Sequence, residues 1–302
     1  MNIKSIPIGE SNSQQGADSA NDRLALRPAR ADNGHLVTPT ALDLQVGLAS
    51  DPGRVRDHNE DTSFALQFMW AQQGEPPLPV GLFILADGMG GHAQGEQASA
   101  LAVRVAARHI INQVYLPLLS DDEGPVMRLP INEVLEASMR MAHEAVLRQL
   151  PRAGTTMTMA LTLGDGVYIA HVGDSRAYLG GGGRLKLLTR DHSMAARLLE
   201  MGRASREEAA TQRNILYKAL GQGAQIEPDI LYQNLAPGQY LLLCCDGLWD
   251  KVPDEEMSAI IEASPTPGTA CQNLVDRANE NGGEDNITVI LAARGWQMPA
   301  HR

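Results

Sequence analysis

Aspartate residues recur at the ends of apolar, strand-like segments, and this placement limits both the folds and the functions open to the chain. Asp87 and Asp246 each follow a continuously apolar run, while Asp174 and Asp285 each stand just before another strand-like run. A single Asp after a strand is usually only part of a turn. Strand ends of one sheet converge in space, however, so we expect several such carboxylates to share one site.

Glu60 and Asp61, at the start of a further strand-like run, would join this cluster. Clustered carboxylates repel one another and raise each other's pKa unless cations neutralise them. A set of oxygen ligands without Cys or paired His favours Mg²⁺ or Mn²⁺ over Zn²⁺. Such ions lower the pKa of a water and clamp a phosphoryl group during in-line displacement. The pattern therefore favours a site for Mg²⁺ or Mn²⁺, and phosphoryl transfer is one reaction that such a site can support.

Hydrophobic periodicity along the chain predicts an α+β fold. Strands are expected at residues 44–50, 62–67, 80–86, 155–163, 167–172, 175–179, 229–233, 239–245 and 286–292. Helices are expected at residues 98–110, 131–146, 193–218, 254–263 and 268–280. The three runs between 155 and 179 are interpreted as one antiparallel meander. Strands in consecutive runs with paired helices between them predict antiparallel sheets covered by helices.

Composition excludes several classes of partner. The 302 residues carry a formal net charge of −11, which disfavours nucleic acid. No window approaches the ~18 apolar residues of a membrane span. The three cysteines have no framework spacing, so they predict buried thiols and the reducing cytoplasm. Residues 1–40 are polar and lack periodicity, so they are expected to form a flexible tail.

A dinucleotide-binding site is disfavoured by the sequence. Residues 88–93 fit the G-x-G-x-x-A fingerprint after a strand, but the fingerprint also needs an acid about 20 residues further on. The corresponding stretch, residues 107–110, contains no acid and lies within a predicted helix. Ser175 likewise lacks a His-Asp partner at a spacing that would make it a nucleophile.

Seven short motifs resemble, in order, those of the type 2C (PPM) family of metal-dependent protein phosphatases in its bacterial form. They span the chain from Val46 to about Ala293. The matching segments are Arg56-Asp-His-Asn-Glu60-Asp61, Ala86-Asp87-Gly88-Met-Gly-Gly-His92, Gly154-Thr155-Thr156, Gly173-Asp174-Ser175-Arg176-Ala-Tyr178, Leu188-Thr-Arg-Asp191-His192, Asp246-Gly247-Leu-Trp249-Asp250 and Asp285-Asn286-Ile-Thr-Val289. Each motif is weak alone, but seven in order are specific.

The resemblance implies a fold of two packed antiparallel β-sheets flanked by helix pairs, an αββα sandwich, over residues 41–295. It implies a flap at about residues 191–221 and a short C-terminal tail at 296–302. It also implies hydrolysis of phosphoserine and phosphothreonine in protein substrates of a Ser/Thr kinase. The enzyme would be a cytoplasmic monomer that uses two Mn²⁺ or Mg²⁺ ions and, at an outer site, a third.

The resemblance also assigns a role to each candidate site residue. Asp87 would bridge two metals. Asp246 and Asp285 would complete the first metal site, and Glu60 with the Gly88 carbonyl would complete the second. Asp61 would support the ligands around them. Arg56 would bind the substrate phosphate through its planar donor fork. Asp174 would join Asp246, with Asp250, at the weaker third metal; the alternative is a simple turn residue.

One position departs from the animal members of the family, which carry His, a candidate general acid, directly after the Asp-Gly pair. This chain has Met89 there, as bacterial members do, so protonation of the leaving group is left to water. His92 is interpreted as a structural residue at the start of a helix, and Trp249 as a core anchor.

Two rival functions stay open at this point. A catalytically weak relative could act as a phosphoprotein-binding module, although none of the five expected carboxylates is lost. Another metal-dependent phosphoesterase could cleave phosphodiesters, although the acidic charge and the lack of His-rich ligand motifs disfavour it.

Overall fold

The computed structural model describes residues 44–71, 77–90, 93–119, 129–205, 208, 211–212 and 214–296. The predicted N-terminal tail, residues 1–40, lies outside these ranges. Residues 297–302 of the predicted C-terminal tail lie outside them as well. His92 also lies outside them, so its predicted structural role is not addressed.

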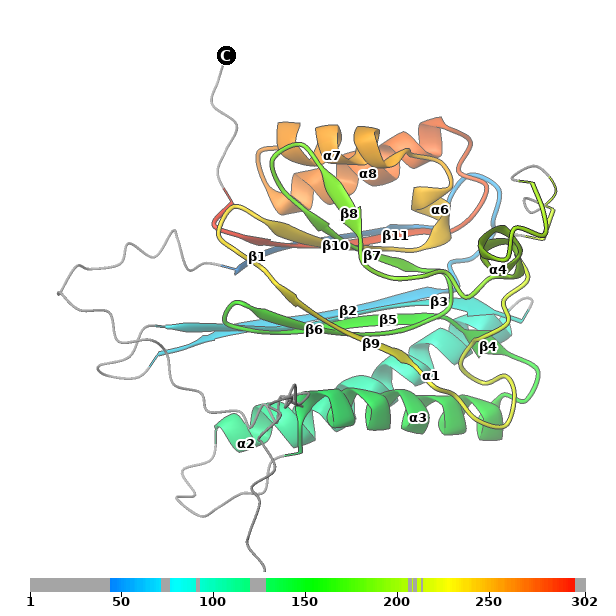
Figure 1. Cartoon of the computed structure of the whole chain (residues 1–302), viewed down its shortest axis with the longest axis horizontal. Coiled ribbons are helices and arrows are strands. Elements are labelled where there is room, and N and C mark those ends of the chain that lie inside the picture. Colours follow the sequence, from blue (N-terminus) through cyan, green and yellow to red (C-terminus); the bar gives the residue numbers. More distant parts are fainter. Residues whose placement is uncertain are drawn as a thin grey trace, which may run out of the picture.

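Two antiparallel sheets stack face to face at the centre of the molecule (Figure 1). The first sheet has the strand order β1-β11-β10-β7-β8. Its strands are β1 (Leu44–Asp51), β7 (Arg176–Gly180), β8 (Leu185–Leu187), β10 (Tyr240–Cys244) and β11 (Ile287–Arg294). The second sheet has the order β2-β3-β5-β6-β9, with β4 paired to β3. Its strands are β2 (Asp61–Trp70), β3 (Leu78–Met89), β4 (Gly154–Thr155), β5 (Met157–Leu163), β6 (Gly166–Val172) and β9 (Asp229–Asn234).

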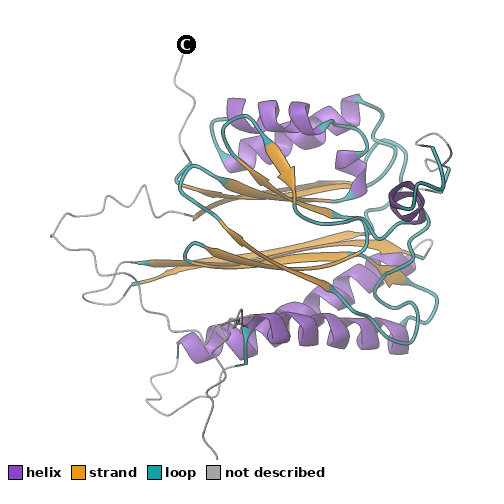
Figure 2. Cartoon of the chain, viewed as in Figure 1, coloured by secondary structure: helices purple, strands orange, loops and turns teal. Residues whose placement is uncertain are grey.

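Helices cover the outer face of each sheet (Figures 1 and 2). The second sheet is covered by α1 (Ala93–Ile110) and α3 (Ile131–Gln149), and α1 continues into a π-helical turn (Ile111–Tyr115) and α2 (Leu116–Leu118). The first sheet is covered by α7 (Asp254–Ala263) and α8 (Pro267–Glu280). Two short helices, α4 (Met194–Glu200) and α6 (Asp246–Trp249), lie near one end of the sandwich. This arrangement confirms the predicted αββα sandwich.

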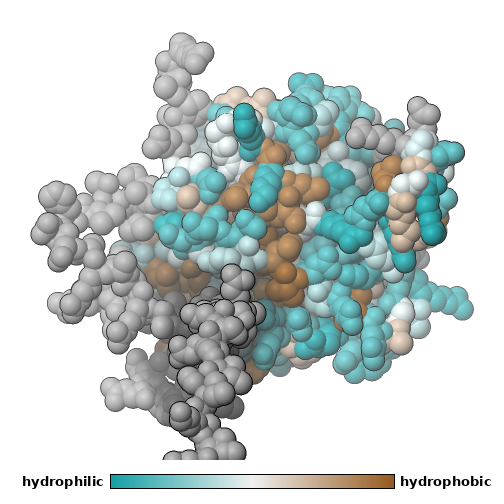
Figure 3. All heavy atoms as spheres, viewed as in Figure 1, coloured by the Kyte–Doolittle hydropathy of each residue, from teal (hydrophilic) through white to brown (hydrophobic). Residues whose placement is uncertain are grey.

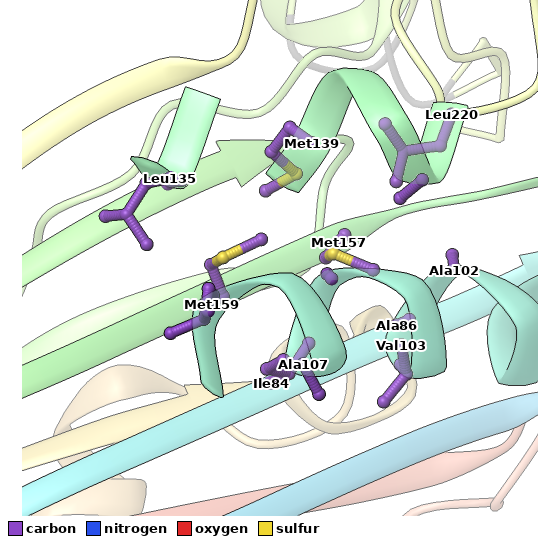
Figure 4. Packing of buried hydrophobic residues seen from close by; sticks show 14 of the residues in the cluster. Ile84, Ala86, Ala102, Val103, Ala107, Leu135, Met139, Met157, Met159 and Leu220 are labelled. Carbon is purple, nitrogen blue, oxygen red and sulfur yellow. The ribbon is translucent and has the colours of Figure 1, made fainter. Parts of the chain in front are cut away.

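Three apolar cores hold these layers together. One lies between the second sheet and the pair α1 and α3, and its buried residues include Ile84, Met159 and Met139 (Figure 4). Another joins the first sheet to α7 and α8, and a third fills the space between the sheets. Because β3 contributes to the first and the third, it is apolar on both faces. The exposed face in Figure 3 shows apolar residues gathered across its middle and hydrophilic residues over most of the rest.

No helix in the described ranges is long and apolar enough to cross a membrane.

The predicted meander between residues 155 and 179 is wrong in one respect. Strands β5 and β6 do pair, but β7 belongs to the other sheet and pairs with β10. The chain changes sheets at Gly173, whose φ of 110° is accessible mainly to glycine. Consequently Asp174 lies at the crossover between the two sheets, where sequence periodicity alone could not place it.

Two other predicted elements also differ from the structure. The expected strand at 155–163 is interrupted at Thr156, which leaves β4 to pair with the end of β3. The expected helix at 193–218 is helical only in α4, and the following residues are mostly irregular where they are described. Gly202 adopts a left-handed φ of 62° just after α4 and ends it, as glycine commonly does.

Candidate metal centre

Carboxylates from separate strand ends of both sheets line one cavity of about 480 Å³. Those predicted as metal ligands and found there are Glu60, Asp87, Asp174, Asp246 and Asp285. Arg56 and Gly88 line the same cavity, as expected. Asp61 is absent from the lining, but it lies opposite Asp87 in the register of β2 and β3. The structure therefore brings the five lining carboxylates together, and it places Asp61 on the strand beside Asp87.

Backbone hydrogen bonds fix Asp87 within β3. The Asp87 amide donates to Thr156 Oγ1 over 2.9 Å, and the Asp87 carbonyl accepts from the Thr156 amide over 2.9 Å. The Thr155 hydroxyl donates to the same carbonyl over 2.9 Å. The strand therefore does not end at Ala86, as predicted, but continues through Asp87 and Gly88 to Met89.

Asn286 ties the segment containing Glu60 to the start of β11. Its side-chain oxygen accepts from the Glu60 amide over 2.8 Å, and its side-chain nitrogen donates to the Pro52 and His58 carbonyls over 3.0 and 2.9 Å. Asp285, the neighbouring residue, accepts from the Asn286 amide over 2.9 Å. Asn286 has no role that the sequence predicts, and its place next to a predicted ligand is the one signal for it in the sequence.

Burial and mutual repulsion raise the pKa values of several carboxylates in the cluster. Burial, followed by the neighbouring carboxylate of Asp61, raises the pKa of Asp87 well above its usual range. Burial also raises the pKa of Asp61 to about 7 and that of Asp246 to about 6. The pKa of Asp174 is raised well above its usual range by burial and then by Asp246. The carboxylates thus favour protons or cations over the free anionic form.

Unpaired buried oxygens test whether the site suits a metal ion. Both carboxylate oxygens of Asp61 and Oδ1 of Asp246 are buried without a hydrogen-bond partner among the described residues. Buried polar oxygens are normally paired, and hard oxygen donors of this kind suit Mg²⁺ or Mn²⁺. In the described part of the chain no three acidic, His or Cys side chains already form a cage around one point. The donor set fits these ions in its chemistry.

Arg56 forms an ion pair inside this cavity. Its Nη2 lies 2.8 Å from Oδ2 of Asp285, and the two side chains are 50% and 39% exposed. Burial lowers the pKa of Arg56 and the Asp285 carboxylate raises it, with a net rise. The guanidinium therefore faces the carboxylates and has access to solvent, as a phosphate-binding group needs.

Asp174 is held by a neighbouring aromatic residue. The indole Nε1 of Trp249 donates to the Asp174 carbonyl over 3.0 Å. The guanidinium of Arg176 stacks 3.6 Å above the Trp249 ring and makes two bonds to Asp191, of 3.0 and 2.7 Å. Trp249 also packs against the core under α7 and α8, as the core-anchor prediction required. Asn214 and Leu216, which lie within the predicted flap, complete the cavity wall with Met89.

Comparisons with known proteins agree with this geometry. The protein phosphatase 2C family profile matches residues 50–287. The serine/threonine phosphatase stp of Listeria monocytogenes is 36% identical over 247 residues, covering 81% of this chain and 94% of that protein. A solved serine/threonine phosphatase of S. agalactiae superposes with a TM-score of 0.69 at 31% identity, covering 83% of this chain and 99% of that one. The catalytic domain of PstP, solved with two manganese ions, gives 0.65 at 33% identity, covering 83% and 97%.

The fold and the carboxylate-lined cavity thus define a metal-dependent phosphatase. The chain belongs to the protein phosphatase 2C family. It is a serine/threonine protein phosphatase, and the resemblance drawn from its motifs is confirmed.

Proposed function

We propose that the chain hydrolyses phosphoserine and phosphothreonine esters of proteins in the cavity at the sheet ends, with two Mn²⁺ or Mg²⁺ ions held by its carboxylates. The observation that carries this proposal is the set of five carboxylates lining one cavity, with buried oxygens of Asp61 and Asp246 left without a hydrogen bond among the described residues. The two manganese ions bound by PstP support the choice of metal.

Each residue takes a definite part in this proposal. Asp87, whose carboxylate is surrounded by four other aspartates, would bridge the two ions. Asp246 and Asp285 would complete one ion site, and Glu60 with the Gly88 carbonyl would complete the other. Asp61 supports Asp87 from the adjacent strand. Asp174 holds a third ion with Asp246 and Asp250.

When bound, the ions lower the pKa of a water and neutralise the phosphate. The chain's own residues do the rest of the positioning. Arg56 exchanges its bond to Asp285 for the phosphate oxygens, to which a guanidinium can donate in a bidentate manner. Met89, at the position of the candidate general acid in animal members, offers no proton, so the leaving serine or threonine oxygen takes one from water.

The remaining features of the enzyme are part of the same proposal. The phosphatase domain spans residues 41–295, with a flap at about residues 191–221. The enzyme works as a cytoplasmic monomer on substrates of a Ser/Thr kinase. The net charge of −11 supports a protein partner over a nucleic acid.

A comparison of substrates tests the proposal. With Mn²⁺ present, a phosphothreonine peptide should be hydrolysed at least ~10²-fold more efficiently, in kcat/KM, than bis(p-nitrophenyl) phosphate, since Arg56 and the ions are arranged around a dianionic monoester. Equal or better cleavage of the diester would favour the phosphoesterase alternative. Tight binding of the peptide without turnover would favour the phosphoprotein-binding alternative.

A further inference from the structure

Two buried histidines bind the two ends of the flap segment, residues 191–221. The flap supplies Asn214 and Leu216 to the wall of the cavity. His192 lies at its first end and is 1% exposed, and His143 of α3 lies against its second end and is 2% exposed. Neither ring has a part in the chemistry proposed above.

At the first end, His192 is joined to the crossover that carries Asp174. The His192 amide donates to the Gly173 carbonyl over 2.8 Å, and the Gly173 amide donates to Nδ1 of the His192 ring over 3.1 Å. Because an amide can only donate, Nδ1 carries no proton. The proton is therefore on Nε2, which lies 3.1 Å from Oδ2 of Asp229.

At the second end, the chain is attached to α3 and to the core. The Gly221 amide donates to Nδ1 of His143 over 3.2 Å, so this ring also has its proton on Nε2. Leu220 pairs with Thr155 through two backbone bonds of 3.0 and 2.9 Å, and its side chain lies in the core beside α3 (Figure 4). Gly221 has a φ of 84°, and a Cβ there would lie 2.4 Å from Val146 of α3.

The base of the flap is closed between these two attachments. Ser193 and Leu216 form an isolated β-bridge, and the Met194 amide donates to the Ile215 carbonyl over 2.7 Å. The Tyr217 amide donates to the His192 carbonyl over 2.9 Å. The two chain segments at the base of the flap are thus bonded to each other. Fixing the two ends of the flap therefore also fixes the position of Leu216 in the cavity wall.

We propose that His192 and His143 are positioning residues of the phosphatase, which as neutral rings hold the flap against the cavity by accepting the amide protons of Gly173 and Gly221. The proposal rests on the proposed function, since it takes the cavity as the phosphopeptide site. A protonated ring has no acceptor nitrogen, so each attachment requires the neutral form.

The surroundings of both rings keep them neutral. Burial lowers the pKa of His192, and Lys218 lowers it further while Asp229 raises it. The ring also packs 4.9 Å from that of His171 and 5.6 Å from that of Tyr217, and Arg190 lies on the preceding chain. Burial lowers the pKa of His143, opposed by Glu144.

Variants that keep or remove the acceptor atom test the proposal. Asn offers a side-chain oxygen near the position of Nδ1, whereas Leu offers none. In the full chain with Mn²⁺, His192→Leu and His143→Leu should each lower kcat/KM for a phosphothreonine peptide by about tenfold, mainly through KM. His192→Asn and His143→Asn should recover most of that loss. Hydrolysis of p-nitrophenyl phosphate, which is too small to need the flap wall, should fall less. His109→Asn, in the outer groove of α1 and α3, is the matched control.

Wild-type kinetics in the Leu variants, or equal losses on both substrates without recovery in the Asn variants, would overturn the proposal. A wild-type enzyme inactive on both substrates would instead refute the proposed function.

A measurement on the unaltered protein covers the case in which a Leu variant does not fold. Nuclear magnetic resonance of the ¹⁵N-labelled chain near pH 7 should show a scalar coupling across the hydrogen bond from the Gly173 amide to Nδ1 of His192, and one from the Gly221 amide to Nδ1 of His143. Both rings should also show the Nε2–H tautomer. A ring protonated at Nδ1 would contradict the proposal.

Discussion

The carboxylate of Asp87 occupies the most constrained position in the site. Both its backbone polar groups are held by Thr156. Burial and four neighbouring aspartates act together to raise its pKa. An aspartate in this setting holds charge only beside a cation, which explains why a carboxylate can lie near the end of a strand that is otherwise almost entirely apolar.

Replacing Asp87 should therefore abolish most turnover while sparing the fold. We expect Asp87→Asn to lower kcat at least ~10²-fold, because the amide cannot bridge two cations. Removing a buried charge that repels its neighbours should leave the melting temperature of the metal-free protein unchanged or higher. Steady-state kinetics and a thermal melt measure both effects, with Asp276→Asn on the exposed face of α8 as the control. Near-normal turnover would rule out the bridging role.

Substitution of Arg56 tests whether this residue binds the substrate phosphate. Since its guanidinium is half exposed and bound to Asp285 in the free enzyme, it is available to ground-state phosphate. Arg56→Ala should raise KM more than it lowers kcat. Arg56→Lys should recover only part of the binding, because an ammonium group cannot donate as a planar fork. A fall in kcat at unchanged KM would place the residue on the transition state instead.

At the scale of elements, the site depends on the close approach of β3 and α1. A Cβ added to Gly88 would lie 2.2 Å from the Gly95 carbonyl oxygen and 2.6 Å from that of Glu60. The Gly88 amide also donates to the Glu60 carbonyl over 3.1 Å. The strand end, the first turn of α1 and the Glu60 segment are thus packed with no room for a side chain.

Gly88→Ala should consequently destabilise the protein by roughly 1–3 kcal/mol through overpacking. It should also displace the Gly88 carbonyl and raise the Mn²⁺ concentration needed for half-maximal activity. Gly268→Ala is the control, since a Cβ there would have only one neighbour, at 3.9 Å. Chemical denaturation and a metal titration check the two parts. A Gly88→Ala variant as stable and as responsive to Mn²⁺ as the wild type would contradict this packing argument.

The helices and strands also show which parts of the fold can be predicted from the sequence alone. Continuous apolar runs such as β3, and amphipathic helices such as α3, were predicted correctly because local periodicity reports their burial. The choice of sheet for β7 depends on pairing with β10, which is more than 50 residues away in the chain and leaves no local signal. The helix predicted at residues 193–218 is wrong beyond α4, because the helix-forming composition there does not report backbone bonds to distant residues, such as that from the Met194 amide to the Ile215 carbonyl.

Sequence motifs also indicate which carboxylates line the cavity. Residues such as Asp246 stand next to glycine at the ends of apolar runs, and this pattern is local enough to be recognised in the sequence. The residues that position them were missed, because the roles of Asn286 and His192 depend on hydrogen bonds to distant backbone.

At the scale of the whole molecule, metal binding should be coupled to stability and to pH. The folded pKa of Asp61 is about 7 and that of Asp246 about 6, both above the value of 3.8 for an exposed aspartate. The metal-free folded state therefore binds more protons than the unfolded state in this range. Its unfolding free energy should decrease as the pH rises from about 4 to about 7.

Mn²⁺ should restore the unfolding free energy that is lost as the pH rises, because it binds the deprotonated carboxylates and stabilises the folded state by mass action. The rise in melting temperature on adding Mn²⁺ should be larger at about pH 7.5 than at about pH 5.5. Comparing each melt with a matched chelator sample at the same pH cancels the contribution of the buried histidines. A rise that is constant with pH, or greatest in acid, would contradict the assignment of these carboxylates.

The most direct test of the whole account is the metal dependence of phosphopeptide hydrolysis. The chain, stripped of metal with chelator and verified to be metal-free, should have no measurable activity on a phosphothreonine peptide. Adding back Mn²⁺ or Mg²⁺ should restore it, while Asp87→Asn should stay inactive at every metal concentration. Full activity of the verified metal-free protein would contradict the account, because no other group in the cavity is assigned to activate water.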